Sequence, residues 1–205
     1  IVTNLYAYVA LLLVLLTFGM ETTFFRFANK EDEEPDTVFS TSFAVTAGLS
    51  AIFLTGILGF ITPISELMGY ADHPEYIMVM ATVVALDAIQ ALPFCYLRYK
   101  KKGIKFASLK LLFIALNIGL NLLYFVWLGK SDVLYVFMLN LACTGIITFF
   151  FLPELTRIKW KVDFQLLGRM LSYSWPVLIL GIAGILNQAA DKMIFPLIYP
   201  DRAQG

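Results

Sequence analysis

The sequence has few of the residues that metal sites and disulfides require. Its 205 residues include one histidine, His73, and two cysteines, Cys95 and Cys143. A single histidine with no cysteine close to it in sequence does not supply a set of metal ligands. Both cysteines fall within long apolar runs, so we interpret them as core residues and predict no disulfide. We expect neither a metal site nor a cofactor.

Charged residues are also scarce. Only 15% of the residues are charged, whereas 60% are hydrophobic, and the mean hydropathy is +0.78. A chain of this composition cannot present an ordinary water-exposed surface. We predict a membrane protein, with membrane lipids as partners and no nucleic-acid partner.

Six apolar stretches are long enough to cross a bilayer, whose hydrocarbon core of about 30 Å needs roughly 20 helical residues. Several are free of ionisable residues, for example between Leu111 and Gly129 and between Met170 and Ala190. Strands of a membrane barrel are about ten residues long and alternate in polarity, so runs of this length indicate helices. The predicted fold class is all-α, a polytopic transmembrane helix bundle with six spans at 1–25, 38–62, 76–97, 106–128, 133–152 and about 171–198.

The distribution of Lys and Arg predicts the orientation, because short loops rich in these residues stay in the cytoplasm. The connections at 27–37, 98–105 and 153–170 are therefore predicted to be cytoplasmic, and the first span runs inward from outside. Residue 1 is Ile, with no basic segment before the apolar run. We expect the chain to be a fragment of a longer protein with at least one helix upstream. Twelve of the fifteen cations support this orientation: Arg26, Lys30, Arg98, Lys100, Lys101, Lys102, Lys105, Lys110, Arg157, Lys159, Lys161 and Arg169.

The stretch "VDFQLLGRMLSYSWP" at 162–176 has the spacing of an amphipathic helix. With Asp163 as its cap, it is predicted to lie in the cytoplasmic interface until Trp175 and Pro176 turn the chain into the membrane. This divides the chain into three parts. Five spans occupy 1–152, the cytoplasmic loop and interfacial helix occupy 153–170, and the last span lies in 171–205.

Polar side chains interrupt several of the apolar spans. Asp87 lies near the middle of the third span, Asn117 and Asn121 lie on one face of the fourth, and Asn187 and Asp191 share the same spacing in the sixth. A mid-membrane acid costs about 2.5–3.5 kcal/mol on insertion scales. Two interpretations stay open. The side chains either join helices, at about 0.6–2 kcal/mol per contact, or line a wet cavity and act there.

Three stretches of the chain resemble one family. They are 4–27 with "GMETTFFRF", 92–125 with the basic "RYKKKGIKFASLK" followed by "NIGLN", and 166–195 with "ADK" near its end. As a set they are similar to the polysaccharide-biosynthesis flippases, the Wzx-type exporters of the MOP (MATE-like) superfamily. The resemblance covers nearly the whole chain. It places the chain at about helices two to seven of a fold with about fourteen, so that 1–152 belongs to the N-terminal lobe and 171–205 begins the C-terminal lobe.

The resemblance implies a function for the chain. Such proteins move undecaprenyl-pyrophosphate-linked oligosaccharide across the bacterial cytoplasmic membrane, for surface polysaccharide such as lipopolysaccharide, by alternating access. We therefore expect a monomeric transporter and not an enzyme. It also implies roles for the polar residues. Candidates for binding the pyrophosphate are Arg26, Arg98 and Lys192, and candidates for binding the sugar are Asn117, Asn121, Asn187 and Gln188. Glu21, Asp87 and Asp191 are candidates for coupling to Na⁺ or H⁺ or for charge pairing.

Other functions fit the composition as well. A cation-coupled multidrug exporter of the same superfamily would use Asp87 as its cation site. A membrane-embedded glycosyltransferase or acyltransferase is disfavoured, since the outer connections at 63–75 and 129–132 are short and only one histidine is available as a base. A passive structural subunit would tolerate neutral residues at Asp87 and Asp191.

Overall fold

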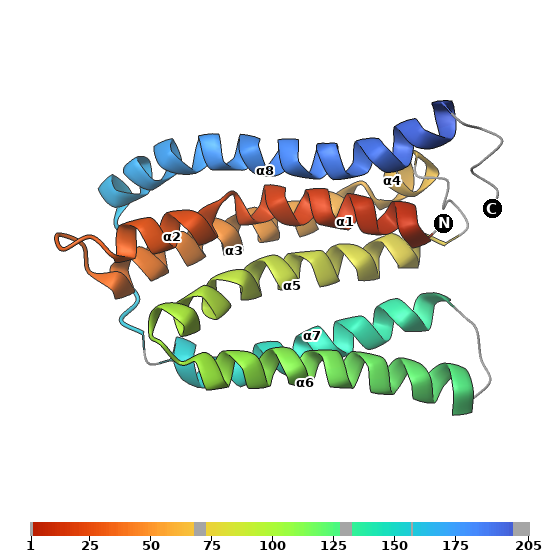
Figure 1. Ribbon diagram of the computed structural model, residues 1–205, viewed down its shortest axis with the longest axis horizontal. Helices are drawn as coiled ribbons and strands as arrows, with labels where there is room; N and C mark the ends of the chain where they lie inside the picture. The colour runs from red at the N-terminus through yellow and green to blue at the C-terminus, as the bar shows by residue number, and fades with distance from the viewer. Residues whose placement is uncertain (1, 68–72, 128–132, 157, 199–205) are drawn as a thin grey trace.

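The computed structural model describes the backbone of residues 2–67, 73–127, 133–156 and 158–198, and the side chains of 9–67, 73–126, 134–153, 155, 156 and 158–187. Within these ranges the regular structure is helical throughout (Figure 1), so the all-α prediction is confirmed. The helices are α1 (Val2–Thr17), α2 (Met20–Ala28), α3 (Pro35–Gly59), α4 (Ile61–Leu67), α5 (Pro74–Tyr99), α6 (Gly103–Leu122), a π-helical turn η1 (Leu123–Trp127), α7 (Val133–Leu155) and α8 (Phe164–Ile198).

Six helical segments in the described part of the chain are long and apolar enough to cross a membrane. The prediction of a six-span, multi-pass membrane protein is therefore confirmed, with ends that differ from the expected ones by several residues. The segments are Val9–Ala28, Pro35–Gly59, Pro74–Tyr99, Gly103–Val126, Leu134–Pro153 and Phe164–Asn187.

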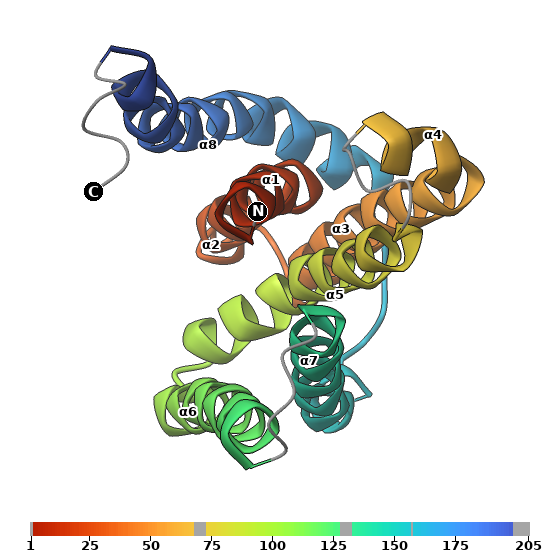
Figure 2. The same ribbon diagram turned by 90° about the vertical axis from the view of Figure 1, so that its right-hand side faces the viewer.

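Helix α5 occupies the middle of the bundle. It packs against α1, α2 and α3 on one side and against α6 and α7 on the other, while α8 lies along α1 and α2 (Figures 1 and 2). The main core cluster joins the first and last spans of the described chain. Met20 and Phe24 of α2 pack there with Phe39 of α3 and with Leu166 and Met170 of α8. The last span is thus built into the same core as the first.

The first span is broken near its middle, where the sequence predicted one helix over 1–25. Phe18 has φ 49° and Gly19 has φ 65°, so the backbone turns left-handed between α1 and α2. The break lies against α8. A Cβ at Gly19 would come within 2.9 Å of Val177 Cγ1 and 3.3 Å of the Ser174 carbonyl oxygen. One turn further, the hydroxyls of Thr23 and Ser174 are 2.6 Å apart and fully buried.

Helix α8 corrects the expectation of a separate interfacial helix. The chain does not turn at Trp175 and Pro176, because a single helix runs from Phe164 to Ile198. The physical reason is a buried stripe at four-residue spacing that crosses the proline without interruption: Leu166, Met170, Ser174 and Leu178. A continuous buried face on one side of a helix holds it straight against its neighbours, and here those neighbours are α1, α2 and α3.

The start of α8 confirms the predicted cap. The carboxylate of Asp163 accepts hydrogen bonds from the backbone N–H groups of Gln165, at 2.8 Å, and Leu166, at 3.0 Å. The hydrogen bond from Leu166 and then that from Gln165 lower the pKa of Asp163 below its ordinary value. A group whose pKa is lowered by folding stabilises the folded state above its unfolded pKa, and this stabilisation is lost as the pH falls through the folded pKa.

We therefore expect Asp163→Ala to lower the melting temperature at pH 7, because two N–H groups at the helix start lose their acceptor. The difference from the unaltered protein should shrink on acidification, when Asp163 is protonated in both states. Thermal unfolding in detergent at a series of pH values measures both effects. Asp163→Asn keeps an acceptor oxygen and should retain most of the stability at pH 7. An Ala variant as stable as the Asn variant would contradict the cap.

Candidate functional site

An acidic and a basic side chain from two different helices meet at the end of the bundle where α5 finishes. Glu21 stands in the first turn of α2, where the break at Gly19 restarts the helix, and Arg98 stands in the last turn of α5. An Arg98 guanidinium nitrogen lies 3.8 Å from Glu21 Oε2 and 3.1 Å from the sulfur of Cys95, whose thiol lies 3.4 Å from the same carboxylate oxygen. Cys95 is buried, but the side chains of Arg98 and Glu21 are 48% and 44% exposed. The ion pair is open to exchange with another anion.

Aromatic rings lie beside the charged groups of Arg98 and Lys110. Arg98 Cζ lies 5.1 Å from the ring centre of Phe25 and 5.7 Å from that of Phe106. Lys110 Nζ lies 4.1 Å from the ring centre of Phe94. A cation over an aromatic face is attracted by about 0.5–2 kcal/mol, more strongly where water is excluded. The positions of both charges are thus set by packed rings on α2, α5 and α6.

Arg26 has a different setting from Arg98. Its guanidinium carbon lies 4.1 Å above the ring of Tyr173, so it contacts α8. Nearby, Arg169 Nη1 lies 2.7 Å from Glu33 Oε1, and the Glu33 side chain is only 13% exposed. These contacts join the start of α8 to the connection between α2 and α3. Arg26 therefore belongs to a contact between the first and last spans.

Asp87 lies between α5 and α7, in the middle of the third span. The hydroxyl of Thr144 is 3.3 Å from Asp87 Oδ1 and 3.4 Å from Asn140 Oδ1. One turn along α5, the buried Gln90 amide donates to the Thr144 carbonyl at 2.8 Å and to the Thr148 hydroxyl at 2.7 Å. Two oxygens of α7 thus accept hydrogen bonds from the Gln90 amide.

The two asparagines of α6 contact each other. The Asn121 side-chain amide donates to the Asn117 carbonyl oxygen at 2.7 Å and to Asn117 Oδ1 at 3.2 Å. Among the described side chains, Asn121 Oδ1 is one of the buried polar atoms with no hydrogen-bond partner. Asn187 is exposed on α8. Gln188, Asp191 and Lys192 follow on the same helix, outside the described side chains.

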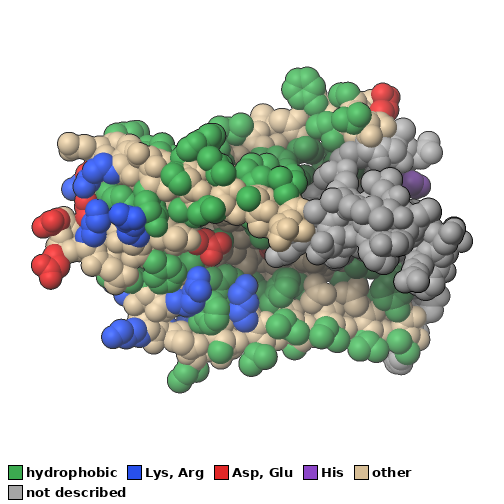
Figure 3. Space-filling view, turned by 45° about the horizontal axis from the view of Figure 1, so that its top comes forward, with side chains coloured by type: hydrophobic (Ala, Val, Ile, Leu, Met, Phe, Trp, Pro, Cys, Tyr) green, Lys and Arg blue, Asp and Glu red, His purple; other side chains and the backbone are tan. Residues whose placement is uncertain are grey.

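Among the described residues, positive charge is concentrated at one end of the bundle. Lys and Arg side chains gather at the end where α2 finishes and α5 turns into α6 (Figure 3).

The chain matches the family model described as polysaccharide biosynthesis protein, over residues 1–205. The chain belongs to this family. No curated protein and no solved structure matches it.

The resemblance of the sequence to polysaccharide biosynthesis proteins is thus confirmed. The polar residues of this polysaccharide biosynthesis protein can be sorted by their neighbours. Sequence reasoning named both Glu21 and Arg98, and the structure brings them together. It did not name Gln90, Asn140, Thr144 or Thr148, of which Thr144 contacts Asp87 and the others contact Thr144. A signal for the last three existed, because they recur every four residues and so share one face of a helix.

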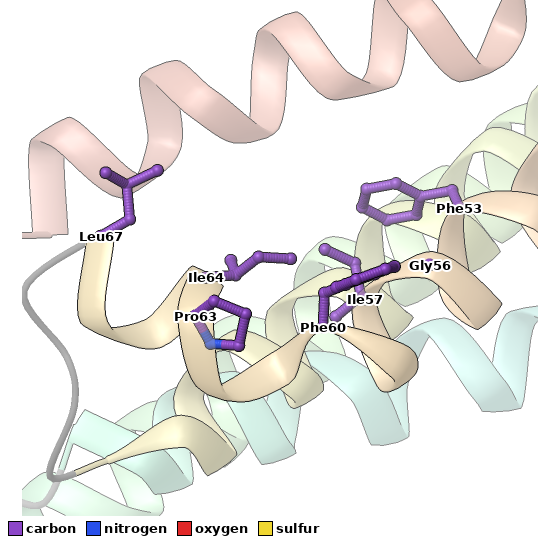
Figure 4. Close-up of a pocket in the computed structure, with 7 residues that line it drawn as sticks. All are labelled: Phe53, Gly56, Ile57, Phe60, Pro63, Ile64 and Leu67. Carbon is purple, nitrogen blue, oxygen red and sulfur yellow. The ribbon is translucent and has the colours of Figure 1, made fainter.

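An apolar groove of about 520 Å³ opens at the other end of the protein, where α3 ends and α4 begins (Figure 4). The sequence predicted one span over 38–62 here, but α3 ends at Gly59 and α4 starts anew at Ile61. None of the sequence-predicted site residues lines the groove. Its lining carries no charge and consists of Phe53, Gly56, Ile57, Phe60, Pro63, Ile64 and Leu67.

Proposed function

We propose that the protein is a flippase, which moves a lipid-linked oligosaccharide across the bacterial cytoplasmic membrane by alternating access. The observation that carries this proposal is the ion pair of Glu21 and Arg98, with Lys110 as a further charge, within the candidate membrane spans of a polysaccharide biosynthesis protein. Charged residues within spans are expensive and mark the paths of ions or substrates. A sugar linked to a lipid through phosphate needs cations at such a place.

The remaining polar residues fit the other parts of such a cargo. Asn117 and Asn121 offer amides to sugar hydroxyls, and the buried Asn121 Oδ1 has an acceptor position to spare. A polyprenyl tail needs no polar contact and stays in lipid. Asp87, with Asn140 and Thr144 beside it, is proposed to couple the cycle to Na⁺ or H⁺. The cation-rich end of the bundle faces the cytoplasm in this proposal.

The experiment that tests the proposal measures the movement of the lipid. The full-length protein is placed in vesicles that carry a fluorescent lipid-linked oligosaccharide on the inner leaflet only. A periodate or lectin probe outside the vesicles detects the oligosaccharide when it reaches the outer leaflet. We expect exposure at least tenfold faster than in protein-free vesicles. Sugar transfer to a new acceptor with no change of leaflet would identify an enzyme instead and contradict the proposal. Extrusion of a cationic dye without lipid movement would favour the multidrug exporter.

A further inference from the structure

The chain between α7 and α8 carries large apolar side chains that the bundle leaves uncovered. Its last part and the first residue of α8, residues 159–164, read KWKVDF, and we call them the interface strap. Three apolar residues of the strap are between 42% and 80% exposed: Trp160, Val162 and Phe164. Two exposed lysines, Lys159 and Lys161, alternate with them. Apolar side chains that gather on a surface mark a contact with a membrane or with another protein.

Hydrogen bonds fix both ends of the interface strap to the first turns of α3. The Ser40 hydroxyl donates to the Lys159 carbonyl oxygen at 3.5 Å. The backbone N–H of Asp163 donates to the Thr41 hydroxyl at 3.2 Å. The strap thus crosses α3 at one level, on its way from α7 to α8 at the cation-rich end of the bundle (Figures 1 and 2).

The depth of the strap follows from the aromatic residues that it contacts on α3. The ring centre of Trp160 lies 6.1 Å from that of Phe39 and 5.3 Å from that of Phe43. Counted from Pro35, these two residues lie about 6 and 12 Å along the helix. The 25 residues of α3 span about 37 Å, only about 7 Å more than the hydrocarbon core. The strap therefore lies beside the span, near the boundary between headgroups and acyl chains.

The side chains of the strap suit this boundary. Tryptophan is enriched at the membrane interface, and the indole N–H of Trp160 already donates to the Leu155 carbonyl at 3.0 Å. The exposed Val162 and Phe164 have no polar group to keep in water. The Asp163 carboxylate accepts hydrogen bonds from N–H groups at the start of α8, so its charge is directed at the helix and not at the lysines.

The two lysines are close enough to contact one headgroup. Lys159 and Lys161 are two residues apart, so their Cα atoms are separated by at most about 7 Å. Each ammonium group stands on a flexible four-carbon stem. Segments that bind at a membrane surface combine apolar side chains with basic ones, and each lysine near an anionic surface strengthens binding about fivefold, which is about 1 kcal/mol. The strap supplies both elements.

We propose that the interface strap binds the headgroup of an anionic phospholipid, with phosphatidylglycerol as the probe. Lys159 and Lys161 contact the headgroup phosphate, while the exposed apolar side chains enter the boundary with the acyl chains. Lipid is favoured over a protein partner because the strap lies at the level of the spans. The bound lipid ties the chain between α7 and α8 to the membrane surface. The proposal is independent of the transported cargo.

The test uses the full-length protein in detergent, and native mass spectrometry measures the Kd of the first phospholipid bound. We expect phosphatidylglycerol to bind more tightly than phosphatidylcholine. The double variant Lys159→Gln, Lys161→Gln should raise the Kd of phosphatidylglycerol about 10- to 30-fold, at about fivefold per lysine, and leave that of phosphatidylcholine unchanged. Phe164→Ser should raise the Kd of both lipids about threefold or more, because an apolar contact is lost.

The matched control is the double variant Lys101→Gln, Lys102→Gln. It removes the same charge from two exposed lysines between α5 and α6, and it should change the Kd of phosphatidylglycerol less than twofold. An equal loss in the control and in the strap variant would assign the binding to general positive charge and overturn the proposal. Unchanged binding in the strap variant would do so as well, and would leave the strap to a protein partner.

Two further measurements complete the test. All these substitutions are on exposed side chains, so the melting temperature should stay the same. If the double variant of the strap melts earlier, Lys161→Glu decides, with an expected rise in Kd of at least fivefold; an unchanged Kd would overturn the proposal. Soluble glycerophosphoglycerol at the lipid concentration should not displace phosphatidylglycerol. Displacement would assign the lysines to a soluble anion instead.

Discussion

Asp87→Asn is expected to reduce surface polysaccharide at least tenfold when the full-length protein complements a strain that lacks its own flippase. Asn keeps an oxygen that can accept from Thr144, as Asp87 Oδ1 does now. What the substitution removes is the negative charge, which the proposed coupling requires. An ionised Asp in mid-membrane costs about 2.5–3.5 kcal/mol on insertion scales. The Asn variant should therefore insert and fold at least as well as the unaltered protein.

Three measurements test this prediction: the amount of surface polysaccharide, the amount of the protein in the membrane, and the melting temperature of the protein in detergent. Asp32→Asn, at an exposed position between α2 and α3, is the matched control and should leave all three unchanged. An unchanged amount of surface polysaccharide in the Asp87→Asn variant would show that Asp87 has no part in the proposed function. Asp87 would then serve only as a contact between α5 and α7. If the Asp87→Asn variant lost both the surface polysaccharide and the protein in the membrane, Asp87 would have a role in folding instead.

Gly19→Ala is expected to destabilise the protein by about 2–5 kcal/mol. About 1–2 kcal/mol comes from placing a Cβ in the left-handed region, where Gly19 has φ 65°. About 1–3 kcal/mol more comes from overpacking, since the new Cβ would approach Val177 Cγ1 to 2.9 Å and the Ser174 carbonyl oxygen to 3.3 Å. The carbonyl belongs to the backbone of α8 and cannot rotate away, so α8 has to shift from α2.

Two further glycines of α8 separate these contributions in the same thermal unfolding experiment. A Cβ at Gly181 would approach Val14 Cγ1 to 2.9 Å, so Gly181→Ala carries the clash without the backbone strain and should have an intermediate effect. Gly168 has nothing within 4 Å, and Gly168→Ala should be neutral or stabilising by up to about 1 kcal/mol. Equal stability of the Gly19 and Gly168 variants would show that the break against α8 does not form.

The existence of the six spans could be predicted from the sequence, whereas their breaks could not. Long runs without charge are sufficient to identify a helix that crosses a bilayer. The break at Phe18 and Gly19 depends on Val177 and Ser174, which approach only when α8 packs on α1 and α2. For the same reason the expected turn at Pro176 is absent. The stripe through Ser174 has buried partners on both sides of the proline, and local sequence does not reveal them.

The candidate site was predictable as a set of residues and not as a set of contacts. Asp87 was named because a charge inside an apolar run is visible in sequence, whereas Glu21 and Arg98 were named through the family resemblance. Their partners depend on which helices are neighbours. Cys95 lies between Glu21 and Arg98 only because α2 packs on α5. Lys110 was counted with the cytoplasmic cations, and its position over Phe94 follows from the way α6 folds back along α5.

The uninterrupted α8 has a mechanical consequence. Its buried stripe is packed as far as Leu178, and Gly181 lies against Val14, beyond which the helix continues for 17 residues to Ile198. At 1.5 Å per residue this is a lever arm of about 26 Å. Rotating such a rod by about 5° around its packed part moves the far end by about 2 Å. A small change in the packing of α8 on α1 is therefore expected to be amplified at Ile198.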